Sequence, residues 1–154
     1  MIEPPVLTDS PARQAAVIHL TIPRDEIQHA MGPAIGEVMA ALEAQGIAPA
    51  GAWYTHHLRT MPDGWDFEVG VPVASPVTPT GRVVRGALPA ARVARTVYAG
   101  GYEGLGEAWG ALGEWMAAHG LRAAENLWEI YLRGPESGDE PAGYRTELNR
   151  PLAV

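Results

Sequence analysis

The spacing of hydrophobic residues changes in a regular order along the first half of the chain. Residues 15–22 form a short apolar run rich in β-branched residues, which predicts a strand. Apolar residues then recur every three or four positions over residues 25–45, which predicts an amphipathic helix that ends at Gly46. Two more runs, separated by a Pro-Asp-Gly turn, predict a strand pair over residues 52–59 and 65–73.

The second half of the chain repeats this order. The pattern predicts a strand over residues 91–98, a helix over residues 102–119 that ends at Gly120, and closing strands over residues 127–133 and 144–152. A shift of 74 positions aligns the two glycines that end the helices. The shift rises to 79 for the last strand, because the second half has a longer final loop. The chain is therefore predicted to contain two βαββ repeats.

The two repeats predict an α+β fold in which one antiparallel sheet carries both helices on one face. A βαββ unit alone has few strands to stabilise it, so we expect the two units to form a single domain over residues 1–154. Repeat one covers residues 11–73, a linker covers residues 74–87, and repeat two covers residues 88–154. We expect a ligand pocket at the pseudo-twofold seam between the repeats, where packed units commonly leave a concave surface.

Composition narrows the classes of function. The chain has 154 residues, 47% of them hydrophobic, and a formal net charge of −7. An acidic protein gains nothing from phosphate neutralisation, so we expect no direct nucleic-acid binding and no attraction to an anionic membrane. No signal peptide and no apolar run near the roughly 18 residues of a membrane span is visible, which predicts a cytoplasmic protein. We expect a monomer or a weak homodimer.

Several kinds of chemistry lack their usual residues. The chain has no cysteine, which excludes disulfides, thiolate metal sites and a cysteine nucleophile. Its five histidines form no metal-binding motif, and no serine lies in a nucleophile elbow. The glycine-rich stretch at residues 99–110 lacks the phosphate-loop pattern, so we interpret it as a tight turn before a helix. We therefore expect neither a metal nor another cofactor.

Glu129 is the first candidate functional residue, because it lies in the middle of a predicted strand among large apolar residues. Side chains alternate between the two faces of a strand. Alternation assigns Trp128, Ile130 and Leu132 to the helix-covered core, and Glu129 and Tyr131 to the opposite face. A carboxylate among aromatic groups would be partly desolvated, so it would bind a cation or exchange a proton. The alternative is an ordinary solvated carboxylate on the open face of a sheet.

Glu147 is the second candidate, because its predicted strand would lie beside the strand of Glu129. Two carboxylates on adjacent strands could share a proton or hold a cation together. The alternative for Glu147 is an exposed charge paired with Arg145 or Arg133, since such surface pairs are common and weak.

Aromatic residues supply candidates for the walls of the pocket. Tryptophan and tyrosine combine apolar area with a hydrogen-bonding group, so they suit stacking and cation–π contacts. Helical spacing makes Trp109 equally compatible with the core, and it favours core packing for Trp115. The candidates for ligand contact are Trp53, Trp65, Tyr98, Tyr102, Trp109 and Tyr131.

Several short motifs are distributed over the two halves of the chain. In the second half they are the Leu-Pro-Ala of residues 88–90, the YAGGYEGL of residues 98–105 before a Trp-containing helix, the LWEIYL of residues 127–132, and the RTEL and RPL segments within residues 145–152. In the first half the matching motif is the EVGVPV of residues 68–73. Together these motifs resemble GyrI-like small-molecule-binding domains, which also occur as the C-terminal effector-binding parts of AraC- and MerR-type regulators. The resemblance covers nearly the whole chain.

The resemblance implies a duplicated βαββ fold with a ligand pocket at the seam. It also implies that Glu129 lies among aromatic residues and faces cationic or amphipathic ligands. Many relatives are the effector halves of regulators that respond to several drugs. The sequence has no room for a DNA-binding module before Pro11, so we expect a stand-alone version that senses or sequesters such ligands.

Two other functions stay open. The resemblance implies that some stand-alone relatives hydrolyse reactive cyclopropane-bearing toxins. In that alternative Glu129 would be the general base, and Tyr131 or Tyr102 would donate a hydrogen bond. The second alternative is a gyrase-inhibitor-like module that binds another protein, since a fold does not determine a function.

Overall fold

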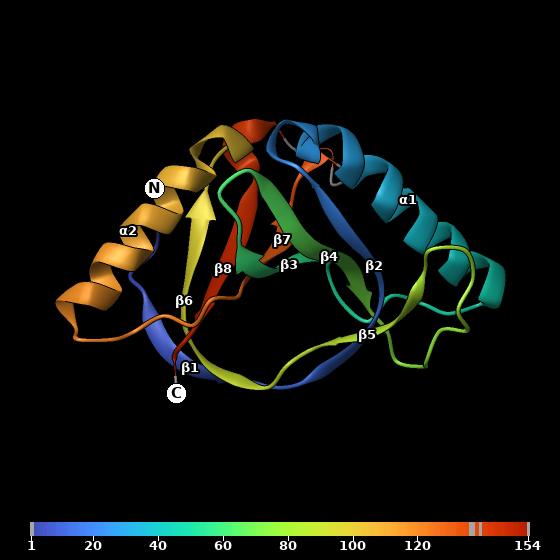
Figure 1. Cartoon of the computed structure of the whole chain (residues 1–154), viewed down its shortest axis with the longest axis horizontal. Helices are drawn as coiled ribbons and strands as arrows, with labels where there is room; N and C mark the ends of the chain where they lie inside the picture. The colour runs from blue at the N-terminus through green and yellow to red at the C-terminus, as the bar shows by residue number, and fades with distance from the viewer. Residues whose placement is uncertain (1, 136–137, 139, 154) are drawn as a thin grey trace. The chain divides into compact units, whose positions relative to one another are not determined.

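The computed structural model describes residues 2–135, 138 and 140–153. The chain divides into two compact units, of which unit 1 contains Met1–Ser10 and Ala91–Val154, and unit 2 contains Pro11–Ala90. Each unit has four antiparallel strands and one α-helix (Figure 1). The α+β fold and its duplication are therefore as predicted.

Unit 2 contains the first repeat. Its helix packs on the two central strands, and the core between them includes Ile18, Val38 and Phe67. A short 3-10 helix precedes the α-helix, which ends at Gly46 with a φ of 67°, a left-handed conformation that glycine adopts without strain. Across the sheet, the elements are β3 (Tyr54–Thr60), β4 (Gly64–Pro72), β2 (Arg13–Pro23) and β5 (Val84–Leu88), with η1 (Arg24–Glu26) and α1 (Ile27–Gln45) on one face.

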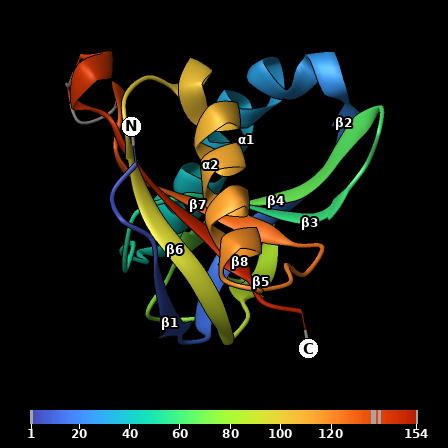
Figure 2. The ribbon, with the colours of Figure 1, turned by 90° about the vertical axis from the view of Figure 1, so that its left-hand side faces the viewer.

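Unit 1 contains the second repeat and the first ten residues. Its helix packs against the sheet (Figure 2), and the core between them includes Tyr98, Leu112 and Leu148. Across the sheet, the elements are β1 (Val6–Ser10), β6 (Ala91–Ala99), β8 (Arg145–Pro151) and β7 (Leu127–Arg133), with η2 (Tyr102–Gly104), α2 (Leu105–Ala118) and a final short helix, η4 (Pro141–Gly143). Within the described residues, no helix is both long enough and apolar enough to cross a membrane.

Two strands, β1 and β5, are absent from the sequence-based prediction, and β5 occupies part of the stretch predicted to be a linker. Both are short strands next to prolines, and each forms one edge of its sheet with mostly exposed side chains. Each of these strands pairs with the repeat that does not follow it in the chain. β1 precedes β2 but pairs with β6, and β5 precedes β6 but pairs with β2. Edge strands of this kind carry little hydrophobic alternation, so pattern analysis misses them.

The two repeats match more closely in structure than in sequence. A register shift interrupts the β3–β4 pairing between His57 and Arg59, and the same irregularity interrupts the β7–β8 pairing between Tyr131 and Arg133. These bulges are 74 positions apart, as the alignment of the helix ends predicts. The starts of the two helices are 78 positions apart, because α1 has 19 residues and α2 has 14. The shift of 74 positions therefore holds at the C-terminal ends of the helices, and α1 is longer than α2 by about one turn.

Candidate functional site

Glu129 lies on the face of β7 that α2 covers. In the sheet register Glu129 pairs with Leu148, and Leu148 packs in the core with Leu112 of α2. The predicted assignment of faces is therefore reversed, because Trp128 and Ile130 point away from α2. Both of these side chains are also buried, so β7 is covered on its two faces, and alternation alone could not show which face meets the helix.

The prediction that Leu132 lies in the core is also wrong, because this residue is 43% exposed. The bulge between Tyr131 and Arg133 adds a residue to β7 at this point, which breaks the alternation of its side chains.

The carboxylate of Glu129 is buried and hydrogen-bonded, with 8% of the residue exposed. The indole Nε1 of Trp109 on α2 donates to Oε2 at 2.6 Å, and the hydroxyl of Tyr131 donates to Oε1 at 2.7 Å. The alternative of an ordinary solvated carboxylate is therefore wrong. Each oxygen has one neutral donor, and Glu129 forms no ion pair within the part of the chain that the structure describes.

The surroundings of Glu129 favour its protonated form. Burial raises the pKa of Glu129 above its ordinary value, while the hydrogen bonds from Trp109 and Tyr131 lower it by a smaller amount. Glu129 therefore holds a proton more strongly than a solvated glutamate does. A positive charge placed next to Glu129 would instead stabilise its ionised form.

Three tyrosines form an aromatic cluster that includes the hydrogen-bond donor to Glu129. The ring of Tyr102 lies edge-on to that of Tyr131 with 5.8 Å between centroids, and it lies 5.1 Å from the ring of Tyr144. Tyr144 is not among the predicted candidates, although it opens the last predicted strand. We define the site cluster as Glu129, Trp109, Tyr131, Tyr102 and Tyr144.

Tyr98 supports the loop that carries Tyr102. Its buried hydroxyl donates to the carbonyl oxygen of Gly101 at 2.8 Å. A Cβ atom at Gly104 would overlap this hydroxyl, so the close approach requires a glycine there. The predicted candidate Tyr98 therefore lies beside the site cluster, with its hydroxyl occupied by the backbone.

Thr146 adds a polar group on the same face of the sheet. It pairs with Tyr131 in the register of β7 and β8, and it is fully buried. Its hydroxyl oxygen has no hydrogen-bond partner in the described part of the chain. A buried hydroxyl without a partner costs stability, so Thr146 leaves an unused hydrogen-bonding group beside Tyr131.

Glu147 does not join this site. It pairs with Ile130 in the register of β7 and β8, so it lies on the opposite face of the sheet from Glu129. Its carboxylate accepts a hydrogen bond from Asn149 at 3.0 Å and lies 3.3 Å from Nε of Arg95. The two carboxylates therefore cannot share a proton or a cation as the sequence prediction allowed, and the ion-pair partner is Arg95.

The other tryptophan candidates lie elsewhere. Trp53 and Trp65 belong to unit 2, where both pack against the core under α1. Trp115 packs against the core under α2, as its helical spacing predicts, and its ring lies 4.3 Å from that of His119. The predicted set of aromatic residues is thus divided between the two units.

A second buried carboxylate, Asp66 of β4, has a different environment. Its Oδ1 lies 2.5 Å from Nε2 of His19 and accepts a hydrogen bond from Thr21, and its Oδ2 accepts a hydrogen bond from Nε of Arg59 at 2.8 Å. The bond to His19 contributes most to lowering the pKa of Asp66 below its ordinary value, with Arg59 and Thr21 adding to this effect. Asp66 is thus an ionised group whose charge is already compensated, unlike Glu129.

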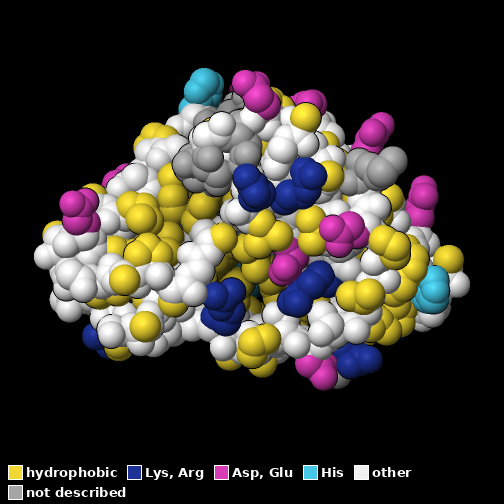
Figure 3. All heavy atoms as spheres, turned by 180° about the vertical axis from the view of Figure 1, so that it is seen from behind, with side chains coloured by type: hydrophobic (Ala, Val, Ile, Leu, Met, Phe, Trp, Pro, Cys, Tyr) yellow, Lys and Arg dark blue, Asp and Glu magenta, His cyan; other side chains and the backbone are white. Residues whose placement is uncertain are grey.

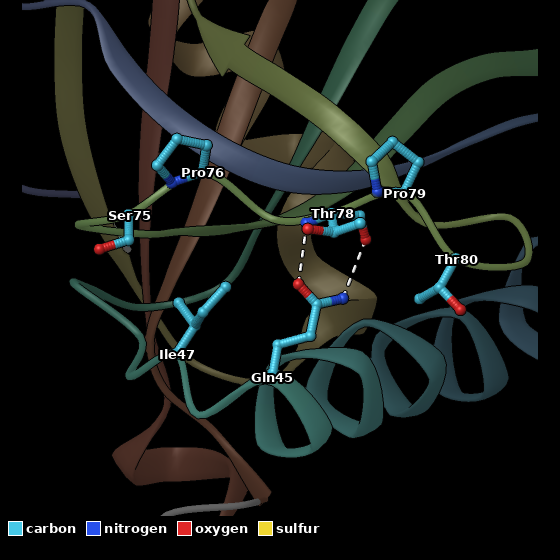
Figure 4. Close-up of a pocket in the computed structure, with 7 residues that line it drawn as sticks. All are labelled: Gln45, Ile47, Ser75, Pro76, Thr78, Pro79 and Thr80. Atoms are coloured by element: carbon cyan, nitrogen blue, oxygen red, sulfur yellow. Dashed lines mark hydrogen bonds between the residues drawn. The ribbon is translucent and has the colours of Figure 1, made fainter.

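A pocket with a volume of about 680 Å³ lies in unit 2, and its lining residues include none of the predicted candidates (Figure 4). The side chain of Gln45, the last residue of α1, accepts a hydrogen bond from the amide of Thr78 and donates one to its carbonyl, at 2.8 and 2.9 Å. These bonds hold the loop before β5 against the end of the helix. The pocket is lined by uncharged residues, namely Gln45, Ile47, Ser75, Pro76, Thr78, Pro79 and Thr80.

Charged groups give no sign of a metal site. Among the described residues, no three His, Cys, Asp or Glu side chains are placed to hold a metal ion. Acidic and basic side chains are interspersed on the face drawn in Figure 3. The charge preference of a site on this protein is therefore set by its nearest groups more than by the net charge.

Solved structures share the fold of this chain at low sequence identity. The C-terminal domain of EcmrR matches with a TM-score of 0.84 and 19% identity, and the match covers 97% of each chain. In its complex with DNA, EcmrR is longer, and this chain spans 57% of its length. A hydrolase from Listeria innocua matches with a TM-score of 0.68 and 14% identity over 97% of this chain and 91% of that chain.

A further neighbour was solved with a ligand. SAV2435 bound to tetraphenylphosphonium matches with a TM-score of 0.72 and 10% identity, over 98% of this chain and 94% of that chain. These identities are low, so the likeness concerns the fold alone. No curated protein shows significant similarity to the chain.

The family of the chain is shown by a match to a family model, because the single structures are too low in identity to show it. The model of the GyrI-like small molecule binding domain matches residues 3–153. This match includes every described element of both repeats, in agreement with the resemblance of the sequence motifs. The chain therefore belongs to the family of GyrI-like small molecule binding domains.

Proposed function

We propose that the site cluster binds a small organic ligand that joins a positive charge to an apolar or aromatic body. The observation that carries this proposal is the buried carboxylate of Glu129, which has neutral hydrogen-bond donors and no ion pair in the described part of the chain. A buried carboxylate is costly unless a positive charge or a proton compensates it. A cationic ligand would supply the missing charge.

The aromatic residues suit the rest of such a ligand. The rings of Tyr102, Tyr131 and Tyr144 lie together beside the carboxylate and offer faces for stacking and for cation–π contacts. A structural neighbour, SAV2435, is bound to tetraphenylphosphonium, which is a lipophilic cation surrounded by phenyl groups. This neighbour supports the class of ligand by analogy of fold.

Calorimetric titration with tetraphenylphosphonium tests the proposal. We expect the wild-type protein to bind the cation and Glu129→Gln to weaken binding by about tenfold to a hundredfold, or about 1.4–2.8 kcal/mol, because the charge is lost while the side-chain shape is kept. Glu107→Gln removes an exposed glutamate from α2 and should leave the affinity unchanged. Tetraphenylborate has the same shape and the opposite charge, so Glu129→Gln should not weaken its binding. An affinity for the cation that is the same in wild type and Glu129→Gln would contradict the proposal.

A second candidate function is hydrolysis of an electrophilic ligand at the same site. The raised pKa of Glu129 suits a general base, and neighbours from Listeria innocua are described as hydrolases. For a strained cyclopropane, Glu129 would accept a proton from water as the oxygen bonds to a ring carbon. The ring carbon–carbon bond would break, and its electron pair would pass to the conjugated acceptor of the substrate, which then takes up the proton.

Mass spectrometry separates binding from turnover. A cyclopropane-bearing electrophile that is hydrolysed gains the mass of one water molecule, and this product should form with wild type and not with Glu129→Gln. If wild type binds the compound and leaves it unchanged over many hours, the protein is a binding module for that ligand.

A further inference from the structure

The first repeat contains a cluster at the same positions as the site cluster of the second repeat. The bulges of β3 and β7 align His57 with Tyr131 and Thr55 with Glu129. The short helices η1 and η2 each lead directly into the main helix of their repeat, which aligns Arg24 with Tyr102.

Trp65 and Tyr144 also occupy equivalent places in the two repeats. Trp65 pairs with Ile22, two residues before Arg24. In the second repeat, the carbonyl of Tyr144 accepts a hydrogen bond from the amide of Gly100, two residues before Tyr102.

The aligned residues of unit 2 are also in contact with one another. The guanidinium of Arg24 lies 4.6 Å from the centre of the Trp65 ring, and the indole Nε1 of Trp65 donates to the carbonyl of Arg24 at 2.9 Å. The ring of His57 lies edge-on to Trp65 at 5.4 Å and is stacked on Phe67 at 5.2 Å. We call Arg24, Trp65 and His57 the first-repeat cluster. The contact of Arg24 with Trp65 corresponds to the contact of Tyr102 with Tyr144, and His57 occupies the aligned position of Tyr131.

The charge of the two clusters is opposite. The place of Glu129 is taken by Thr55, and the place of Tyr102 is taken by Arg24. The guanidinium of Arg24 is held in position by the ring of Trp65 and by the carbonyl of Met61, which accepts a hydrogen bond at 3.0 Å. Arg24 forms no ion pair within the residues that the structure describes, so its positive charge is positioned and uncompensated.

We propose that the first-repeat cluster is a separate ligand site that takes a planar aromatic anion, such as an aryl sulfonate or an aryl carboxylate. The anionic group would bind the nitrogen atoms of Arg24 that face solvent, and the rings would stack with Trp65 and His57. Arg24 is exposed, and Trp65 and His57 each keep part of their surface exposed. This site goes beyond the proposed function, because it lies in the other unit and has the opposite charge preference.

The neighbouring groups are compatible with an anion. Asp25 and Glu26 follow Arg24 in the chain, but both are exposed to solvent, which screens their charges. Burial and the nearby His56 lower the pKa of His57 to about 4, so its imidazole is a neutral aromatic ring at pH 7. The site therefore offers one fixed positive charge beside neutral rings.

Two naphthalene probes with opposite charges test the proposal on the full-length chain. 1-Naphthalenesulfonate is the anionic probe, and (1-naphthylmethyl)ammonium is the cationic probe with the same ring. The indole N–H signals of the five tryptophans can be resolved by nitrogen-15 NMR and assigned with Trp→Phe variants. Trp65 donates to Arg24 and Trp109 donates to Glu129, so these two signals report on the two clusters separately.

We expect the sulfonate to shift the Trp65 signal and Arg24→Gln to weaken its binding by about tenfold or more. Arg24→Lys should give an intermediate affinity, because lysine keeps the charge and loses the planar group. Arg82→Gln removes another half-exposed arginine of unit 2 and is the matched control, with unchanged sulfonate affinity. The Trp65 signal without ligand shows whether the first-repeat cluster stays intact in each variant.

Two results would overturn the proposal. One is a Trp65 signal that does not move at millimolar sulfonate. The other is equal affinity of the sulfonate for Arg24→Gln and wild type. Sulfonate binding that is lost in Glu129→Gln would also count against it, since the anion would then depend on the other unit. A failure of the ammonium probe to shift the Trp109 signal bears on the proposed cation site alone.

Discussion

The indole nitrogen of Trp109 lies 2.6 Å from Oε2 of Glu129, so a buried carboxylate joins helix α2 to strand β7. The hydroxyl of Tyr131 donates to the other oxygen at 2.7 Å. Both donors are neutral, so they orient the carboxylate without cancelling its charge. Asp66, by comparison, has an arginine among its donors. Glu129 therefore differs from Asp66 in that no positively charged side chain compensates its charge among the described residues.

Replacing Trp109 tests this hydrogen bond. Trp109→Phe keeps a ring on α2 and removes the indole N–H, so the pKa of Glu129 should rise further. Loss of this hydrogen bond from a buried carboxyl group should lower the free energy of unfolding at pH 7 by about 1–3 kcal/mol. The pKa is measured by carbon-13 NMR titration, and the stability by urea unfolding. Trp115→Phe on the same helix is the control and should leave the pKa of Glu129 unchanged. An unchanged pKa in Trp109→Phe would show that the indole does not act on the carboxylate.

The stability of the protein should carry a pH dependence from Glu129. Its pKa in the folded chain is raised, so its contribution to stability is fully present below its ordinary pKa and is lost as the pH rises through the folded value. Over that window the free energy of unfolding of wild type should fall with rising pH relative to that of Glu129→Gln. The two stabilities are compared by urea unfolding at a series of pH values. Parallel curves for wild type and Glu129→Gln would show that the folded and unfolded pKa values are the same.

Thr146 offers a prediction about an unsatisfied hydroxyl. Thr146→Val keeps the shape of the side chain and removes a buried hydroxyl that has no partner among the described residues. We expect the free energy of unfolding to rise by about 1–3 kcal/mol, because an unpaired polar group is no longer buried. Thr96→Val is the matched comparison on the same sheet, and it should destabilise, because the Thr96 hydroxyl donates to the carbonyl of Glu3 at 2.6 Å. Destabilisation by both variants would show that the Thr146 hydroxyl has a partner in solution.

Gly104 should tolerate no side chain while Tyr98 keeps its hydroxyl. A Cβ atom at Gly104 would overlap that hydroxyl, so Gly104→Ala should destabilise by about 1–3 kcal/mol. In a Tyr98→Phe background the same change should cost less, and thermal unfolding of the four proteins of this cycle measures the difference. Gly106→Ala, where a Cβ meets open space, is the control and should stabilise the helix by up to about 1 kcal/mol. Equal costs of Gly104→Ala in both backgrounds would contradict the contact.

Much of the fold follows from hydrophobic periodicity. The helices at residues 27–45 and 105–118 and the six inner strands lie within a few residues of their predicted ranges. Helical spacing marks the two helices, and apolar runs bounded by turn residues mark the strands. The edge strands β1 and β5 escape prediction, since edge positions do not require alternation. The extra turn of α1 is equally hidden, because a helical pattern continues unchanged through an inserted turn.

The site is harder to predict than the fold, because its geometry depends on which face meets the helix. Sequence alternation correctly groups Glu129 with Tyr131, and their hydrogen bond follows from that spacing. It cannot show that α2 covers this face, so the contact of Trp109 with Glu129 is visible only in the structure. Glu147 illustrates the same limit, because the register of two strands decides whether neighbouring carboxylates share a face.

The most direct test of a cation site at Glu129 is the pKa of its carboxyl group, measured by carbon-13 NMR titration with and without tetraphenylphosphonium. We predict a pKa above the ordinary glutamate value in the free protein, because the group is buried. Saturation with the cation should lower this pKa by about one unit or more, since an opposite charge within about 4–6 Å favours the ionised form. If the cation binds and the pKa of Glu129 stays the same, the ligand does not lie against this carboxylate, and the proposed site is wrong.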